Sequence, residues 1–166
     1  MRVAVLVAEM FEEPELLYPY YRLLEAGHQA VLVGSAAEEY KGKHGYPVRA
    51  EVAVGDLKAV DLDGMVVPGG FGPDSLRLDP AMVALTRDMA AAGKPVAAIC
   101  HGPSLLVSAD VLRGRRATSY AAVRDDVRNA GATWVDEPVV VDGPIITSRV
   151  PDDLPDFTRA LLAALG

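Results

Sequence analysis

The sequence has one cysteine, Cys100, few aromatic residues and no long basic or apolar run. A single cysteine cannot form an intrachain disulfide, so we expect a reducing compartment, the cytoplasm. Only 6% of the residues are aromatic whereas 51% are hydrophobic, which predicts an aliphatic core. The formal net charge is -7 and the longest basic run is Arg115-Arg116, so a nucleic-acid-binding face is not expected. No apolar run approaches the roughly 18 residues of a membrane span.

The first apolar segment, residues 1–7, resembles the start of a signal peptide. It is too short for one, and Glu9, Glu12 and Glu13 follow it directly, so we interpret it as a first strand. A length of 166 residues is typical of one domain, and we expect a single domain over residues 1–166.

Strand-like and helix-like segments alternate along the chain. Helix signals are clear, as at Pro14 in a first turn and Gly27 after a last one. The alternation predicts an α/β fold in which helices cover both faces of a mainly parallel central sheet. The expected strands are 2–7, 28–34, 63–67, 95–99, 133–135, 138–141 and 145–148; the expected helices are 13–26, 80–92, 104–108, 121–130 and 152–165; and 40–54 is expected to form a loop and a hairpin or edge strand.

Cys100 lies between an apolar strand and a helical segment, in the order Ala98-Ile-Cys-His-Gly102. Small residues two positions before and after a nucleophile are typical of a nucleophile elbow, a sharp turn between a strand and a helix. Such a turn places the sulfur at a helix N-terminus, where the dipole and the free N–H groups favour the thiolate. A lone cysteine is more often a small buried apolar residue, and the elbow spacing is what favours a nucleophile.

Two further groups are expected beside Cys100, because ligands of parallel α/β sheets bind outside the carboxyl ends of the strands. Glu12 follows the first strand, and Gly69-Gly70 follows the strand at 63–67. If these strands are neighbours, the three groups meet in one crevice. The N–H groups of Gly70 and His101 would then form an oxyanion hole. The Glu12 carboxyl, with its pKa raised by burial beside a thiolate, would donate a hydrogen bond to the sulfur.

The three histidines, His28, His44 and His101, restrict the mechanism. No histidine follows His101, which excludes a hydrolase with a downstream histidine base and a glutaminase-type triad. The base must be His101, His44 or a group from another chain. Because adjacent side chains usually diverge, a Cys100–His101 dyad requires the unusual elbow backbone and a carboxylate that orients the imidazole.

No metal site and no cofactor site are expected. One cysteine and scattered histidines lack the spacing of metal ligands. The segment Pro68-Gly-Gly-Phe-Gly72 matches neither a phosphate-binding loop nor a dinucleotide-binding motif.

The segment Ala98-Ile-Cys-His-Gly-Pro103 resembles the nucleophile signature of the PfpI-like branch of the DJ-1/ThiJ/PfpI superfamily. The resemblance covers nearly the whole chain and implies a flavodoxin-like, three-layer α/β/α sandwich. The other segments that carry it are Phe11-Glu12, Glu15-Leu16, Gly42-Lys-His-Gly45, Leu112-Arg-Gly-Arg115, Asn129-Ala-Gly131 and Thr147-Ser-Arg-Val-Pro-Asp-Asp-Leu154. Together these segments are specific to that branch.

The resemblance also implies roles for single residues. Cys100 would be the nucleophile, His101 its partner, Glu12 the carboxyl that contacts the sulfur, and Gly70 an oxyanion donor. In the family a third catalytic acid follows the Gly-Gly turn and reaches the active site of a neighbouring subunit. The matching residue is Asp74, where archaeal peptidase-like members carry glutamate and bacterial members described as deglycases or general stress proteins carry aspartate.

The same resemblance suggests what surrounds this centre. His44 and Tyr120 fall in segments that resemble the peptidase-like members, and with Gly69 they are candidate pocket residues. Dimers and often hexamers are typical of the branch, so self-association and an intersubunit site are expected.

Three functions are compatible with these residues. The first is a cofactor-free thiol enzyme that acts on reactive carbonyls, either glyoxals or their adducts on proteins. The second is an intracellular cysteine peptidase, in which the same thiolate attacks an amide. The third is a stress-responsive redox sensor or chaperone, since an accessible thiol of low pKa is readily oxidised.

Overall fold

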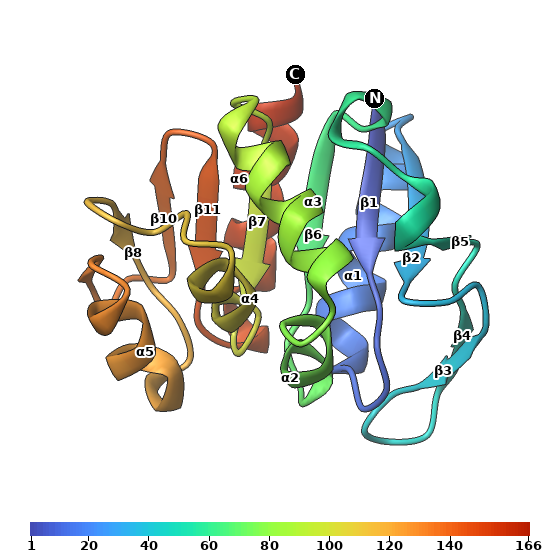
Figure 1. Cartoon of the computed structure of the whole chain (residues 1–166), viewed down its shortest axis with the longest axis horizontal. Coiled ribbons are helices and arrows are strands. Elements are labelled where there is room, and N and C mark those ends of the chain that lie inside the picture. Colours follow the sequence, from blue (N-terminus) through green and yellow to red (C-terminus); the bar gives the residue numbers. More distant parts are fainter.

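The computed structural model describes residues 1–166, in which strands and helices alternate as the sequence predicts (Figure 1). The strands are β1 (Arg2–Leu6), β2 (Gln29–Gly34), β3 (Glu39–Lys41), β4 (Pro47–Arg49), β5 (Val52–Ala53), β6 (Gly64–Val67), β7 (Val96–Ile99), β8 (Arg116–Ala117), β9 (Thr133–Trp134), β10 (Val139–Asp142) and β11 (Ile145–Ser148). The α-helices are α1 (Glu13–Glu25), α2 (Gly72–Leu76), α3 (Pro80–Ala91), α4 (Pro103–Ser108), α5 (Arg124–Asn129) and α6 (Leu154–Leu165). None of these helices combines the length and the apolar composition that a membrane crossing requires.

A seven-stranded sheet forms the middle layer, in the order β10-β11-β7-β6-β1-β2-β5. All neighbouring strands in it are parallel except β10 and β11, which are antiparallel. The α/β fold and the mainly parallel sheet predicted from the alternating segments are therefore confirmed. The central position of β7, β6 and β1 is what brings the segments after these strands together.

Both faces of the sheet are buried, because helices cover each of them. Successive residues of β1 point to opposite faces, so Ala4 packs into one apolar cluster and Val5 into the other. The helices α3, α4 and α5 contribute to the first cluster, and α1 and α6 contribute to the second. Figure 1 shows α3 in front of the sheet and α1 and α6 behind it. This is the three-layer, flavodoxin-like arrangement implied by the family resemblance.

The structure refines several expected elements. Residues 40–54 form both of the expected alternatives, since β3 and β4 pair as an antiparallel hairpin and β5 is an edge strand of the main sheet. The helix expected at 121–130 begins with a 3-10 turn, Ala121–Val123, before α5. The short helix α2 and the strand β8 were not predicted. Gly72 and Pro73 at the start of α2 are residues that usually indicate a loop.

Candidate active site

The segments that follow β1, β6 and β7 meet at one edge of the sheet, as the sequence predicts. Phe11 forms a bridge with Gly70, and the Glu12 N–H donates to the Gly69 carbonyl oxygen at 3.2 Å. A cavity of about 400 Å³ opens at this edge. It is lined by Glu12, Glu15, Lys43, Gly70, Phe71, Cys100, His101, Tyr120, Val150 and Pro151.

Cys100 has the sharp backbone turn of a nucleophile elbow. Its φ of 62° is in the left-handed region, which costs a residue with a side chain about 1–2 kcal/mol. Hydrogen bonds hold the turn in place: the Cys100 N–H donates to Ser148 O at 3.0 Å, and Cys100 O accepts from the Tyr120 N–H at 2.9 Å. The strained conformation therefore persists because two other segments of the chain fix it.

Gly102, two positions after the cysteine, must be glycine for a steric reason. A Cβ at Gly102 would overlap the carbonyl oxygen of Val67 and would lie 2.8 Å from that of Ile99. Gly102 itself has an ordinary helical φ of -51°, so the requirement comes from the close approach of the β6 and β7 backbones. Only glycine lets the chain turn this tightly beneath the sulfur.

Cys100 and His101 form a close pair despite being adjacent in the sequence. His101 Nδ1 lies 3.3 Å from Cys100 Sγ. The imidazole stacks on the Tyr120 ring with the ring centres 5.0 Å apart. Burial lowers the pKa of His101, while the negative charge of Asp74 in the same chain acts in the opposite direction. The neutral imidazole is thus favoured and can accept a proton from the thiol. Of the two histidine candidates within the chain, His101 is the one that the fold brings to the sulfur, whereas His44 pairs with Glu13.

The carboxyl beside the sulfur corrects the expectation for Glu12, because it belongs to Glu15. The Glu15 side chain is fully buried, accepts a hydrogen bond of 2.7 Å from the Gly69 N–H, and lies close enough to Cys100 for its charge to act on the thiol. Glu12 precedes the helix and its carboxylate turns to Lys43 instead. A signal for Glu15 was present in the sequence, since it adjoins Leu16 at the start of the buried stripe of α1.

Glu15 and Cys100 hold their protons unusually strongly. Burial raises the pKa of Glu15 to about 7, although the Gly69 N–H opposes this. Burial and the charge of Glu15 raise the pKa of Cys100 to about 12, and the N–H groups of His101 and Gly70 oppose it. The expected preference for thiolate at a helix N-terminus is therefore outweighed by burial and by the charge of Glu15. When Glu15 is protonated its charge disappears, and its O–H can then donate a hydrogen bond to the sulfur.

The two expected oxyanion donors lie at the sulfur. The backbone N–H groups of Gly70 and His101 both point to Cys100 Sγ closely enough to stabilise negative charge there. Gly70 has a φ of 78°, and a Cβ at this position would lie 2.5 Å from the Glu12 nitrogen. Glycine is needed for the N–H to face the cavity.

Lys43 is a cavity residue that the sequence did not single out. Its Nζ lies 2.7 Å from Glu12 Oε2 and 5.7 Å from the centre of the Phe71 ring. The hydrogen bond with Glu12 raises the pKa of Lys43. The β3–β4 hairpin carries this cation across the cavity, a contact between segments about thirty residues apart that no local pattern reveals.

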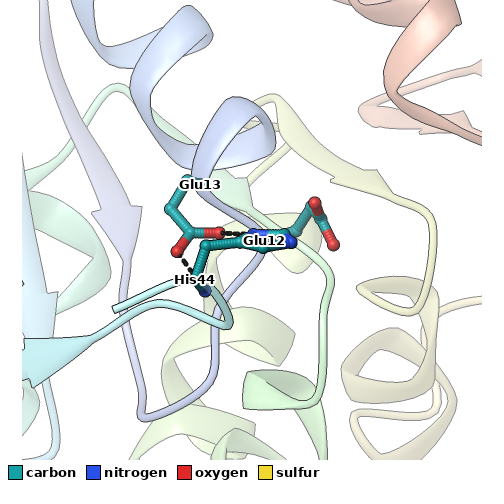
Figure 2. A group of neighbouring side chains, drawn as sticks. All are labelled: Glu12, Glu13 and His44. Carbon is teal, nitrogen blue, oxygen red and sulfur yellow. Dashed lines mark hydrogen bonds and ion pairs between the residues drawn. The ribbon is translucent and has the colours of Figure 1, made fainter. Parts of the chain in front are cut away.

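His44 does not line the cavity, contrary to the expectation. Its Nδ1 lies 2.9 Å from Glu13 Oε2, and its backbone N–H donates to Glu13 Oε1 at 2.6 Å (Figure 2). Gly69 also lies outside the lining and instead holds Glu15. Glu12, Glu13 and His44 offer ligand atoms within 4.8 Å of one another, a grouping that the spacing of the sequence does not predict. All three already have polar partners, because Lys43 pairs with Glu12 and His44 with Glu13.

Tyr120 lines the cavity as expected, and Asp74 lies at its periphery. Asp74 is exposed on α2, and its charge acts on His101 of its own chain. Its expected contact with the active site of a neighbouring subunit stays a prediction.

The arrangement can be compared with known proteins. The model of the DJ-1/PfpI family matches residues 1–164. The chain belongs to the DJ-1/PfpI family. It is 47% identical over 165 residues to a deglycase of Pyrococcus abyssi, covering 99% of both chains. It is 44% identical over 168 residues to protein/nucleic acid deglycase 2 of Escherichia coli, covering 99% of this chain and 98% of the relative.

A solved structure of another DJ-1/PfpI protein has nearly the same fold. It is a two-domain protein of Anabaena variabilis with DJ-1/ThiJ/PfpI-like and ferritin-like domains. The TM-score is 0.98 at 42% identity, and the match covers 99% of this chain and 48% of that one. The family resemblance seen in the nucleophile segment is therefore confirmed over the whole chain.

Proposed function

We propose that this DJ-1/PfpI protein is a cysteine-dependent enzyme that hydrolyses reactive carbonyl compounds and their adducts on amines, a deglycase or glyoxalase. The observation that carries the proposal is the sulfur of Cys100 in an open cavity, 3.3 Å from His101 Nδ1 and facing two backbone N–H groups. The names of the relatives support it, since two of them are deglycases at 44–47% identity.

The first step would be addition of the Cys100 sulfur to the aldehyde carbon of methylglyoxal. The proton of the thiol passes to His101 Nδ1 as the carbon–sulfur bond forms. Negative charge develops on the former carbonyl oxygen, where the N–H groups of Gly70 and His101 stabilise it. His101 then returns the proton to this oxygen, and the product is a hemithioacetal. With an aminocarbinol adduct as substrate, the sulfur replaces the amine, which leaves with a proton.

The second step would convert the hemithioacetal into lactate. A proton removed from the carbon that bears the sulfur is returned to the neighbouring carbon, which gives a lactoyl thioester without any external oxidant. His101 and the protonated Glu15 are the groups that can carry these protons. Water then cleaves the carbon–sulfur bond, releasing lactate and restoring the thiol of Cys100.

Turnover of methylglyoxal to lactate tests this function. The wild-type protein is expected to produce lactate, and the Cys100→Ala variant is expected to produce none above the uncatalysed rate. The removed sulfur is the only thiol of the chain, so no other cysteine can substitute. Lactate is measured enzymatically after the protein has been removed. Equal rates for the two proteins would rule out the proposed function.

His101→Phe is expected to lower kcat by about 10²–10⁴-fold, the usual contribution of a general acid–base group. Phenylalanine keeps an aromatic ring against Tyr120 but cannot carry a proton. The measurement is kcat for methylglyoxal, with the thermal midpoint as a check on folding. If kcat were unchanged in a folded variant, proton transfer would have to be assigned to Glu15 alone.

Peptide hydrolysis by the same thiol is the alternative. Expulsion of an amide leaving group needs a well-placed acid, and a carboxylate usually orients the imidazole that supplies it. Within one chain His101 makes its hydrogen bond with Cys100 and none with a carboxylate. This favours carbonyl addition, which has no amide leaving group to protonate. Cleavage of casein by the purified wild-type protein and not by Cys100→Ala would reverse the preference.

A further inference from the structure

A second cavity of about 280 Å³ lies beside the catalytic cavity. The two cavities share Tyr120 and Val150 as a common wall. The second one is lined by Ser119, Tyr120, Ala121, Trp134, Asp136, Arg149 and Val150. None of the catalytic steps above uses it.

Two aromatic residues give this cavity a fixed shape. The Trp134 Nε1–H donates to Ser119 Oγ at 3.0 Å, and the Ser119 hydroxyl donates to the Tyr120 carbonyl oxygen at 2.9 Å. The Tyr120 ring is held by stacking on His101. The guanidinium groups of Arg124 and Arg128 lie 6.0 Å and 5.7 Å from the centre of the Trp134 ring. The indole therefore has a fixed place before any ligand arrives.

The charged groups of the cavity are already paired. Arg149 donates to both oxygens of Asp153, at 2.9 Å and 3.1 Å, and to Asp136 at 2.8 Å. Its charge is compensated by these two carboxylates and is not available to bind an anion. Apart from Ser119, the rest of the cavity lining is aromatic and aliphatic and is formed by Tyr120, Trp134, Ala121 and Val150. Such a surface binds an uncharged apolar side chain by excluding water from it.

We propose that this cavity, bounded by Tyr120, Trp134 and Val150, is a subsite for an aromatic or large aliphatic side chain of a peptide substrate. The inference rests on the proposed function and specifies its substrate class. The catalytic cavity alone has room for about a dozen waters at about 30 Å³ each, far more than a small dicarbonyl fills. A peptide whose modified residue reaches Cys100 would place a neighbouring residue across Tyr120 in this aromatic subsite.

Binding can be measured directly, because Trp134 is the only tryptophan of the chain. The Cys100→Ala variant is titrated with two acetylated tripeptide amides that have a central arginine, a residue that glyoxals modify. One peptide has phenylalanine on both sides of it and the other has glycine. We expect a saturable change of Trp134 fluorescence and binding of the phenylalanine peptide at least about 10-fold more tightly, since burying such a side chain contributes about 1.5–3 kcal/mol.

A blocking variant links the preference to the cavity. Ala121→Phe, made in the Cys100→Ala background, adds a ring to the subsite and is expected to reduce the ratio of the two affinities to about 1. The matched control is Ala164→Phe, on the exposed side of α6, which is expected to keep the ratio. Equal affinities for the two peptides in the parent variant, or a ratio that survives Ala121→Phe, would overturn the subsite.

The peptide titration and the methylglyoxal assay test the subsite and the proposed reaction separately. A preference abolished by Ala121→Phe supports the subsite even if methylglyoxal is not turned over, in which case only the proposed reaction fails. Turnover of methylglyoxal together with equal peptide affinities would instead overturn the subsite and leave a glyoxalase that acts on small carbonyl compounds.

Discussion

Glu15→Gln is expected to make the protein more stable than the wild type at pH 8, by about 3 kcal/mol. Burial raises the pKa of Glu15 from 4.5 to about 7 in the folded state, and this difference corresponds to that free energy. Between these two pH values the folded chain holds a proton that the unfolded chain has lost. The free energy of unfolding of the wild type therefore falls as the pH rises from about 4.5 to about 7, and it stays lower above pH 7.

Glutamine cannot ionise, so the variant should lose this pH dependence. Its amide oxygen can still accept the hydrogen bond from Gly69. The measurement is the urea midpoint of both proteins between pH 4 and pH 8. The matched control is Glu25→Gln at the exposed end of the same helix, for which a change within about 0.5 kcal/mol at every pH is expected. Parallel curves for wild type and Glu15→Gln would contradict the assignment of the raised pKa.

The same substitution should slow catalysis while it stabilises the fold. A glutamine amide can donate a hydrogen bond to the sulfur but cannot transfer a proton to it or take one up. We expect kcat for methylglyoxal to fall by about 10²-fold or more, the size of a lost proton-transfer step. A variant that is both more stable and fully active would show that Glu15 has no part in the chemistry.

Gly102→Ala is the second substitution for which a large effect is expected, with a loss of about 3 kcal/mol or more of stability and no measurable turnover. The added methyl group would overlap Val67 O and approach Ile99 O, which are backbone atoms of neighbouring strands. Overpacking in a core costs about 1–3 kcal/mol even where side chains can move, and here none can. Movement of the turn would also displace the Cys100 sulfur from its two N–H groups.

A protein normally becomes more stable, by about 1 kcal/mol, when a glycine in a helix interior is replaced by alanine. The Gly102→Ala substitution should instead destabilise the protein, so the sign of the stability change tests the steric explanation. The control is Gly55→Ala, where the added Cβ would meet no atom within 4 Å and a neutral or slightly stabilising effect is expected. Urea unfolding and methylglyoxal turnover of both variants decide the question. An active Gly102→Ala protein of wild-type stability would contradict the steric account of the elbow.

The sequence was most informative where the determinant was local. The order Ala98-Ile-Cys-His-Gly102 describes one turn, and the same few residues that define the pattern also impose its geometry. The alternation of strands and helices likewise predicted the sheet, because a buried parallel strand needs a continuous apolar run. The meeting of Cys100, Gly70 and the end of β1 was expected only on the condition that their strands are neighbours, and the order β7-β6-β1 meets that condition.

Contacts between segments far apart in the sequence were harder to predict from the sequence alone. The choice between Glu12 and Glu15 depends on where α1 begins and on the direction in which its first turn points. Both residues lie in one acidic run, and the position of Glu15 beside Leu16 is a weak signal that its complete burial in the folded chain makes clear. Lys43 reaches the cavity on a hairpin whose position depends on Phe11 and Gly42, through a bridge that no local pattern encodes. The roles of such residues become visible only in the folded chain.

The two hydrogen bonds that clamp the Cys100 peptide unit come from segments that follow it in the chain. Ser148 ends β11 and Tyr120 follows β8, so the turn cannot be locked until the C-terminal third of the protein has docked. Before that moment the sulfur has neither its left-handed backbone nor its aligned donors. A chain in which these segments have not docked therefore carries an ordinary cysteine, and the reactive centre exists only where the C-terminal third is folded onto β7.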